Sequence, residues 1–395
     1  MTLDMLRVGN EALELCRKHP HDYVLYFPIK YGILNFEVNK HYVIDEHTIL
    51  DIIVYMMNKC IRDIMSTRNE TSFNLLIIMS DTLINHYWSH VKTIVNEILV
   101  QNTNISHLSI QRESIMSYYG CGISHNQTEL ITIDMGLTKT SIYSYNTQGR
   151  IQSNLILPYG GYDIYNLING ILQMSKFNHS IDIGMNLNEY DNNVRKYYMT
   201  LKTSAHQETF QHLQNILIDE GQLAKTMTIS SDVFYIATHM YFNTKLLPSP
   251  KKKIYQSLNH LSSTSKITSI DKYLLKSIKS SGSTTICLIG GFSNIQHYPE
   301  YLKEILKKKR IKILMGNERD KLVPTYALSW KGGVIMTHLL APMSTQDSES
   351  VSSSKDQSNT SMEDSSEQGH LKSRLFTTRS EVFSSHFKAL HDRII

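Results

Sequence analysis

The chain has 395 residues, of which 41% are hydrophobic and 19% charged, and its formal net charge is +4. A chain of this length is too long for one simple core, and so mild a charge neither requires nor excludes a nucleic-acid partner. The four cysteines include no close pair, which excludes a CxxC metal site and a disulfide framework, and no apolar run reaches the ~18–20 residues that span a bilayer. Because the opening residues also lack a signal-peptide pattern, we expect a soluble intracellular chain without a membrane partner.

Hydrophobic periodicity predicts alternating strands and helices in the first third of the chain. Strands are expected at Tyr23–Leu34, where Pro28 and Gly32 interrupt the pattern, at Asn74–Ser80 and at His107–Gln111; helices are expected at Thr48–Met65, at Trp88–Gln101 and from about Glu113. Such alternation predicts an α/β architecture in which helices cover the sheets.

The elements after residue 125 begin with a strand hairpin, Leu130–Tyr145, which turns through Asp134 and Gly136. The pattern that follows predicts helix from Gly160 to about Gln214, helix at Asp271–Lys279, a buried strand in Thr284–Phe292, helix at Pro299–Lys309, a strand at Arg310–Met315 and an amphipathic segment at Ser380–Ile395.

Two polar segments interrupt this pattern. Residues 248–266 contain three consecutive lysines and are expected to form a surface loop or insertion. Residues 344–373 are rich in serine and acidic residues and hold almost no apolar side chain. Because such a segment cannot bury enough surface to offset its ordering entropy, we expect residues 344–373 to be disordered.

Three glycine-bearing turns follow apolar, strand-like runs: Asp134–Gly136, Gly160–Asp163 and Gly290–Phe292. The second and third also precede a helical pattern. Glycine at such a junction lets backbone N–H groups approach a phosphate closely. A tight turn that needs a positive φ explains each of them singly, so it is their order along the chain that points to a nucleotide.

In this order the motifs resemble those of the actin superfamily. Residues 130–145 look like its second phosphate hairpin, Leu157–Ile168 like the segment that enters the large lobe, residues 284–306 like the adenosine-motif strand, turn and helix, and Tyr326–Leu339 like the tryptophan-glycine-glycine helix. Arg7–Leu13 and residues 26–34 resemble early small-lobe sequence, so the resemblance covers most of the chain. Details are closer to the actin-related protein 8 family than to conventional actin: Gln111–Ser114, Gly120–Gly122, Lys139–Ser141, Leu157–Asp163 and Ser329–Gly333.

The resemblance implies a two-lobed α/β fold of ribonuclease H-like sheets flanked by helices. It assigns residues 1–125 to a small-lobe-like part, 126–343 to the large lobe with the insertion at 248–266, 344–373 to the disordered segment, and 374–395 to a C-terminal helical segment that packs back on the body. It also implies nucleotide-binding positions, which are Asp134, Met135, Gly136, Leu137, Gly161, Asp163, Lys202, Gly290 and Gly291.

The sequence departs from the actin pattern where ATP hydrolysis would take place. The chain reaches Arg7–Leu13 almost at once, so the first phosphate hairpin is expected to be missing. Leu137 occupies the position at which actin repeats its acidic residue, and Glu113 occupies the position of a glutamine in actin. Thr203 follows Lys202, where the family usually has an acidic residue. Leucine cannot order a magnesium-bound water, and an anion near a γ-phosphate opposes transition-state charge. We therefore expect no enzyme activity: ATP binding is possible, and magnesium only together with ATP.

The resemblance implies a nuclear subunit of the Ino-eighty chromatin-remodelling complex. Such a subunit works beside a Snf2-type motor, actin and another actin-related protein, and it contacts histones and DNA. The implied roles are transcription regulation, DNA repair and recombination. Lys251–Lys253 and Lys307–Arg310 could touch DNA phosphates or be a solvated loop tip and helix end. The residues leave other functions open: an active actin-superfamily ATPase, a sugar-kinase-like enzyme, or a polymerising or cytoskeletal actin-related protein. Trp330 is expected to lie in the core or to face a partner.

Overall fold

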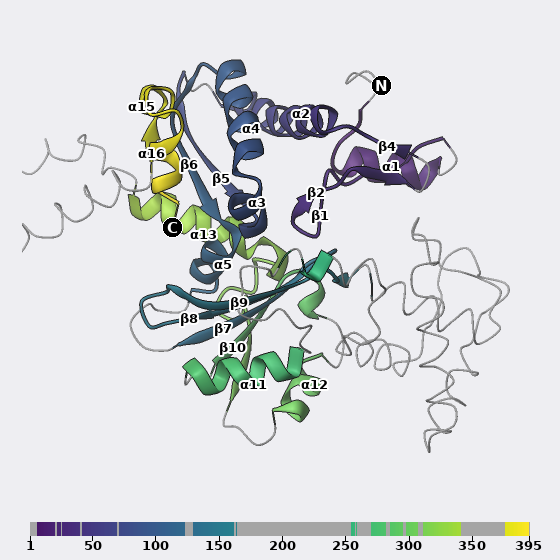
Figure 1. Cartoon of the computed structure of the whole chain (residues 1–395), viewed down its shortest axis with the longest axis vertical. Helices are drawn as coiled ribbons and strands as arrows, with labels where there is room; N and C mark the ends of the chain where they lie inside the picture. The colour runs from purple at the N-terminus through teal and green to yellow at the C-terminus, as the bar shows by residue number, and fades with distance from the viewer. Residues whose placement is uncertain are drawn as a thin grey trace, which may run out of the picture. The chain divides into compact units, whose positions relative to one another are not determined.

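The computed structural model describes residues 6–163, 254–258, 270–281, 285–294, 298–306, 311–340 and 376–394, leaving out positions 20–21, 25, 40–41, 69–70, 123–128, 162 and 257. The chain divides into two compact units, and the predicted α/β architecture is confirmed in both (Figure 1). Unit 1 comprises Met1–Gly122 and Leu328–Ile395, and unit 2 comprises Ile123–Ala327.

Unit 1 is built on a sheet with the strand order β12-β6-β5. Strand β5 (Phe73–Met79) runs parallel to β6 (Ile105–Arg112), and the short β12 (Thr377–Thr378) pairs antiparallel with β6. Helices α2 (Glu46–Met65), α3 (Asp81–His86) and α4 (Trp88–Gln101) supply most of the remaining core, in which Ile49, Val91, Val95, Ile98 and Leu99 are completely buried. The predicted helices at 48–65 and 88–101 correspond to α2 and α4.

Helix α2 begins where the sequence provides a cap. The Asp45 carboxylate accepts a hydrogen bond from the Thr48 amide at 2.9 Å, and its second oxygen accepts one from the Thr48 hydroxyl at 2.8 Å. These bonds hold the pKa of Asp45 below its usual value. A side-chain acceptor at this position satisfies one of the amides that the first helical turn leaves unpaired.

The single strand predicted at 23–34 is instead a small hairpin. Only β1 (Ile29–Lys30) and β2 (Ile33–Leu34) are extended, and they pair antiparallel around Tyr31 and Gly32, which have φ angles of 58° and 80°. Two successive positive φ angles are typical of the tight two-residue turns that suit the twist of a hairpin. Helix α1 (Asn10–Lys18) precedes this hairpin, and a second pair, β3 (Glu37–Asn39) and β4 (Tyr42–Val43), follows it.

Tyr26 ties the approach to this hairpin to its exit. Its hydroxyl donates a hydrogen bond to the Asn35 carbonyl, and the Asn35 side chain donates one to the Phe27 carbonyl at 2.9 Å. Burial raises the pKa of Tyr26 to about 12, so the phenol stays protonated as the donor throughout the neutral range.

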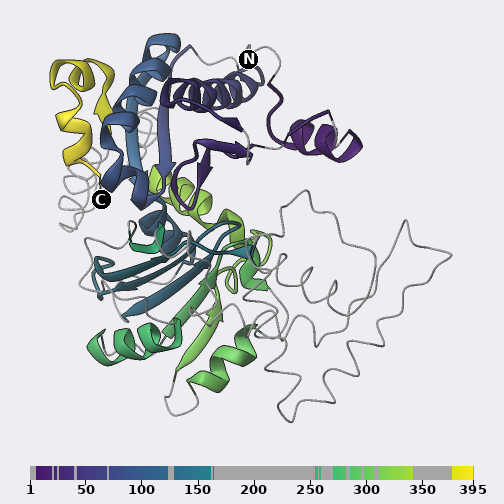
Figure 2. The same ribbon diagram turned by 45° about the vertical axis from the view of Figure 1, so that its right-hand side comes forward.

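The C-terminal residues lie along β6 in unit 1 (Figures 1 and 2). After β12 come two short helices, α15 (Arg379–Ser384) and α16 (Lys388–Asp392), separated by His386 and Phe387 at positive φ. The Arg393 guanidinium donates to both carboxylate oxygens of Glu381, at 2.6 and 3.3 Å, and the Gln111 side chain donates to the Arg393 carbonyl at 3.2 Å. The amphipathic segment predicted at 380–395 consists of these two short helices.

Helices α5 (Glu113–Gly120) and α13 (Leu328–Leu340) cross at backbone contact within unit 1. A Cβ placed on Gly332 would lie 1.7 Å from the Met116 carbonyl oxygen, and one on Gly120 would lie 1.9 Å from the Leu328 carbonyl oxygen. This crossing groups α13 with unit 1, whereas the sequence analysis assigned all of 126–343 to the second lobe. On the same helix, the Trp330 side chain is 63% exposed, so it is not a core residue.

Unit 2 holds a five-stranded sheet with the order β11-β10-β7-β8-β9. Strands β7 (Leu130–Met135), β10 (Thr285–Ile289) and β11 (Lys312–Met315) are parallel, and β8 (Thr140–Tyr145) and β9 (Ile151–Leu157) continue the sheet antiparallel. The pairing of β7 with β8 corresponds to the hairpin predicted at 130–145.

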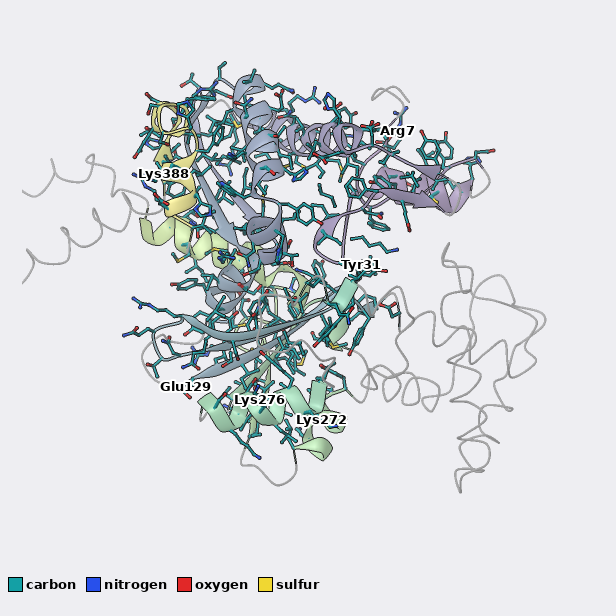
Figure 3. The ribbon with its side chains drawn as sticks, viewed as in Figure 1. Arg7, Tyr31, Glu129, Lys272, Lys276 and Lys388 are labelled. Atoms are coloured by element: carbon teal, nitrogen blue, oxygen red, sulfur yellow. The ribbon has the colours of Figure 1, made fainter. Side chains whose placement is uncertain are left out.

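The helices described in unit 2 include α11 (Ile270–Ser281) and α12 (Tyr298–Ile305). Helix α11 packs on β8 and β9 through buried Tyr273, Leu274 and Ile278. Its exposed lysines include Lys272 and Lys276, which Figure 3 shows on this helix. The helix predicted at 299–309 corresponds to α12, whose described part ends at Ile305.

Several predictions fall outside the described residues. These are the helical pattern after Asp163, the insertion at 248–266 apart from a few positions, the basic run 307–310 and the acidic segment 344–373. Within the described residues, every helix is too short or too polar to cross a membrane.

Candidate functional site

The parallel strands β7 and β10 end side by side at one edge of the unit 2 sheet. Ile289, the last residue of β10, pairs with Asp134, the penultimate residue of β7. The chain then leaves β7 through Gly136 and β10 through Gly290. In open α/β sheets, ligands bind in the crevice beyond the carboxyl ends of parallel strands. Two of the three predicted glycine turns therefore lie where a nucleotide would be expected.

The hairpin that joins β7 to β8 has a tight, internally bonded tip. Asp134 faces Ser141 across the pair, and the Gly136 amide donates to the Lys139 carbonyl at 3.0 Å, which leaves Leu137 and Thr138 at the turn. Within the described residues, the non-glycine positions with positive φ do not include Leu137 or Thr138. The Leu137 side chain is half-buried and supplies no oxygen ligand at this tip.

The turn after β9 lies directly on this hairpin. The Gly161 amide donates to the Gly136 carbonyl at 3.0 Å, and a Cβ on Gly160 would come within 2.4 Å of the same oxygen. The Asp163 carboxylate accepts the Gly160 amide at 2.7 Å and is only 1% exposed. Asp163, a predicted nucleotide contact, is thus engaged in closing its own turn, much as an acidic residue does in a capping box.

The third glycine turn, after β10, has space only for a glycine at Gly290. The φ angle of Gly290 is 88°, and a Cβ there would lie 2.4 Å from the Met135 carbonyl oxygen and 2.5 Å from the Asp134 carboxylate. The Gly290 amide donates to the Thr325 carbonyl at 3.2 Å, and the Thr325 hydroxyl donates to the Gly290 carbonyl at 2.8 Å. The neighbouring Gly291 is exposed, and a Cβ there would make only an ordinary contact, 3.7 Å from the Tyr326 Cβ.

One contact joins the second and third turns through a side chain that the sequence analysis did not single out. A Cβ on Gly161 would lie 2.1 to 2.2 Å from three carbons of the Phe292 ring, so the Gly161 backbone rests against the ring face. Phe292 directly follows the glycine pair and is half-buried. The sequence signal for this contact was the aromatic residue after the glycine pair, but Gly161, the residue that it contacts, lies far away in the sequence.

The glycine turns are therefore packed chiefly against one another. The amides of Gly136, Gly160, Gly161 and Gly290 all donate to acceptors inside the protein. A polar atom without a partner lies on the same sheet face as Asp134: the Ser141 hydroxyl is buried and makes no hydrogen bond among the described residues. These glycine amides therefore serve the fold at this sheet edge.

The acidic residues described at this edge are Asp134 and Asp163. Asp134 approaches Gly290, Asp163 bonds the Gly160 amide, and Leu137 stands at the hairpin tip. Nowhere in the described ranges do three histidine, cysteine, aspartate or glutamate side chains gather so as to hold a metal ion. Magnesium is bound by carboxylates together with substrate phosphates, so Asp134 is the residue that could face such an ion.

Three further predicted residues complete the comparison with the sequence. Met135 is completely buried, and its carbonyl oxygen lies against Gly290. Lys202 lies outside the described residues, and Glu113 begins α5 in unit 1. A separate pocket of about 480 Å³ lies between α12 and the end of β11, and its lining includes none of the predicted nucleotide positions.

Comparison with known proteins was made for both sequence and structure. No protein-family model and no curated protein match the sequence. The structure matches human actin-related protein Arp8 in its ATP-bound state, with a TM-score of 0.58, at 19% identity, covering 93% of this chain and 69% of that one. Because 479 chains of solved structures match, the fold is widespread and does not by itself specify a function. The chain thus has the actin-like fold predicted from its motifs.

Proposed function

We propose that this actin-fold chain is a non-catalytic, actin-related subunit of a nuclear chromatin-remodelling complex. In this role it acts as an adaptor: it joins a Snf2-type motor, actin and other actin-related proteins, and it contacts histones and DNA. Through the Ino-eighty complex it serves transcription regulation, DNA repair and recombination. The support for the subunit role is the similarity to human Arp8 along 93% of the chain, together with the sequence motifs that resemble the same family.

The proposal that the chain does not hydrolyse ATP is supported by the residue at the tip of the β7–β8 hairpin. Leu137 occupies the position that the resemblance to actin assigns to a second acidic residue, and its side chain can hold neither a metal ion nor an attacking water. Removing one charge-stabilising group typically lowers a catalytic rate ~100- to 1000-fold. A protein that only binds partners through its surface does not need the second acidic residue, whereas a fast ATPase does.

ATP remains a possible bound cofactor, held rather than consumed. The similar human protein was solved in its ATP-bound state, and Asp134, Gly290 and Gly291 lie here at the carboxyl ends of parallel strands, where α/β sheets bind ligands. If ATP binds, Asp134 is the residue placed to face an accompanying magnesium ion, and the hairpin tip is placed to face the phosphates.

The proposed DNA contact has one described basic surface to support it. Lys272, Lys276 and Lys279 are exposed along α11 at a spacing that aligns them on one helix face. Figure 3 labels the first two of them. Lysines in such a row bind phosphates without reading sequence, so any affinity they contribute falls as salt rises. The basic runs at 251–253 and 307–310, also proposed for DNA, lie outside the described residues.

The experiment that tests the subunit role is affinity purification of the tagged full chain from nuclei, with tagged conventional actin and the tag alone as parallel baits. We expect a Snf2-type motor and actin to be recovered with the chain in near-stoichiometric amounts, and not with the tag. Isolation of the chain as a free monomer, or in filaments that pellet without a motor, would contradict the proposal and favour an actin-superfamily ATPase or a cytoskeletal actin-related protein.

A further inference from the structure

The contact between Gly161 and Phe292 lies between the two glycine turns to which the nucleotide was assigned. Gly161 is bonded to the hairpin through the Gly136 carbonyl, and Phe292 extends from the turn that Gly290 anchors against Asp134. The ring face covers the Gly161 backbone so closely that even a methyl group could not be added there. A flat base or a ribose needs more room than a methyl group, so none can rest on Gly161 while the ring stays in place.

The backbone that carries Phe292 is held firmly. The Ser293 hydroxyl and the Thr325 hydroxyl both donate to the Gly290 carbonyl, at 2.7 and 2.8 Å, and both residues are buried. The Gly290 amide in turn donates to the Thr325 carbonyl. Because these bonds fix the turn, the ring can leave Gly161 only by rotating about its own side-chain bonds.

The ring is not locked into a core, however. Phe292 is half-buried, and Gly291 beside it is exposed, with the Tyr326 Cβ 3.7 Å from where a Cβ on Gly291 would lie. Rotation towards solvent would forfeit the contact with Gly161 and expose apolar surface, which makes the rotated state the minor one. Such a ring can open and close, unlike a fully buried phenylalanine.

We propose that Phe292 is a plug for the nucleotide crevice: its ring closes the space over Gly161, and an adenosine nucleotide enters only when the ring rotates away. This inference takes from the proposed function only the idea that the crevice is a nucleotide site, and it does not depend on the chromatin role. The apparent affinity for the nucleoside part is then reduced in proportion to the fraction of molecules in the open state.

The plug predicts which part of the ligand is excluded. A ligand made only of phosphates has no base or ribose to place over Gly161, so the Phe292 ring does not exclude it as it excludes a nucleoside. Removing the ring should therefore strengthen binding of ATP and of adenosine and leave binding of inorganic tripolyphosphate unchanged.

The test is isothermal titration calorimetry of the full chain with ATP, adenosine and tripolyphosphate, each with and without magnesium. We expect Phe292→Ala to bind ATP and adenosine about tenfold more tightly than the wild type does, which corresponds to about 1.4 kcal/mol. Phe292→Tyr retains the ring and should match the wild type. Phe292→Leu retains apolar bulk without a flat ring, so it should show an intermediate gain even if the alanine variant folds poorly. Circular dichroism and the midpoint of thermal unfolding establish that each variant is folded.

Three results would overturn the inference. Equal ATP affinity in the wild type and Phe292→Ala would mean that the ring does not limit entry. Weaker binding by Phe292→Ala would mean that the ring is a stacking platform for the base. If neither protein binds ATP or adenosine, the crevice is not a nucleotide site at all; the subunit role would still stand or fall on the nuclear purification.

Discussion

Replacing Gly332 with alanine is expected to destabilise unit 1 by more than about 3 kcal/mol, because it forces two crossed helices apart. The new methyl group would lie 1.7 Å from the Met116 carbonyl oxygen and 2.9 Å from the Gly120 amide nitrogen. Both are backbone atoms of α5, so no side-chain rotation can relieve the clash. The measurement is hydrogen exchange followed by mass spectrometry, in which peptides from α5 and α13 should lose protection most strongly.

The neighbouring glycine on α13 provides a matched control for this substitution. A methyl group on Gly333 would meet only the ends of the Ile78 and Leu76 side chains, at 3.0 and 3.1 Å. Those ends can shift, and alanine favours a helix interior over glycine by ~1 kcal/mol, so Gly333→Ala should stay within about 1 kcal/mol of the wild type. Equal loss of protection in the two variants would show that the close helix crossing is not what holds α13 in unit 1.

Gly290→Ala is expected to destabilise the carboxyl edge of the unit 2 sheet by about 3 kcal/mol. A left-handed backbone costs a non-glycine residue ~1–2 kcal/mol, and here the φ angle is 88°. The added Cβ would also clash with the Met135 carbonyl oxygen at 2.4 Å and the Asp134 carboxylate at 2.5 Å. Hydrogen exchange should show the loss in peptides from β7 and β10, while peptides from α5 in unit 1 serve as the internal reference.

Gly291→Ala is the control one residue away. Its φ is not positive, and the nearest atom to the added Cβ would be the Tyr326 Cβ at 3.7 Å, an ordinary contact distance. We expect a change of no more than about 0.5 kcal/mol, as for surface substitutions in general. If Gly291→Ala were as harmful as Gly290→Ala, the role assigned to Gly290 in holding the two strand ends together would be wrong.

Local patterns predicted much of the fold. The long helices α2 and α4 and the buried strands β5 and β10 follow directly from apolar spacing, because each covers enough residues for its period to show. The β7–β8 hairpin was also predicted, and the three glycine turns do lie at one sheet edge. These features depend on contacts between residues close in sequence or on strand ends that parallel pairing brings together.

Features that depend on distant contacts were not predictable from one sequence. Strand β12 is only two residues long and pairs with Leu108 and His107, so no local period marks it. The grouping of α13 with unit 1 depends on glycines of α5 and α13 meeting across a long stretch of chain. At the site, the contact between Phe292 and Gly161 required two turns far apart in the sequence to be placed in space.

We propose that this actin-like fold has kept its glycine turns without the chemistry of ATP cleavage. A single-turnover assay tests it directly: purified full chain in excess over radiolabelled ATP with magnesium, with conventional actin measured in parallel. Because Leu137 replaces a group whose loss typically lowers a rate ~100- to 1000-fold, we predict phosphate release at least about 100-fold slower than in actin. Release of phosphate at the rate of actin would contradict the account.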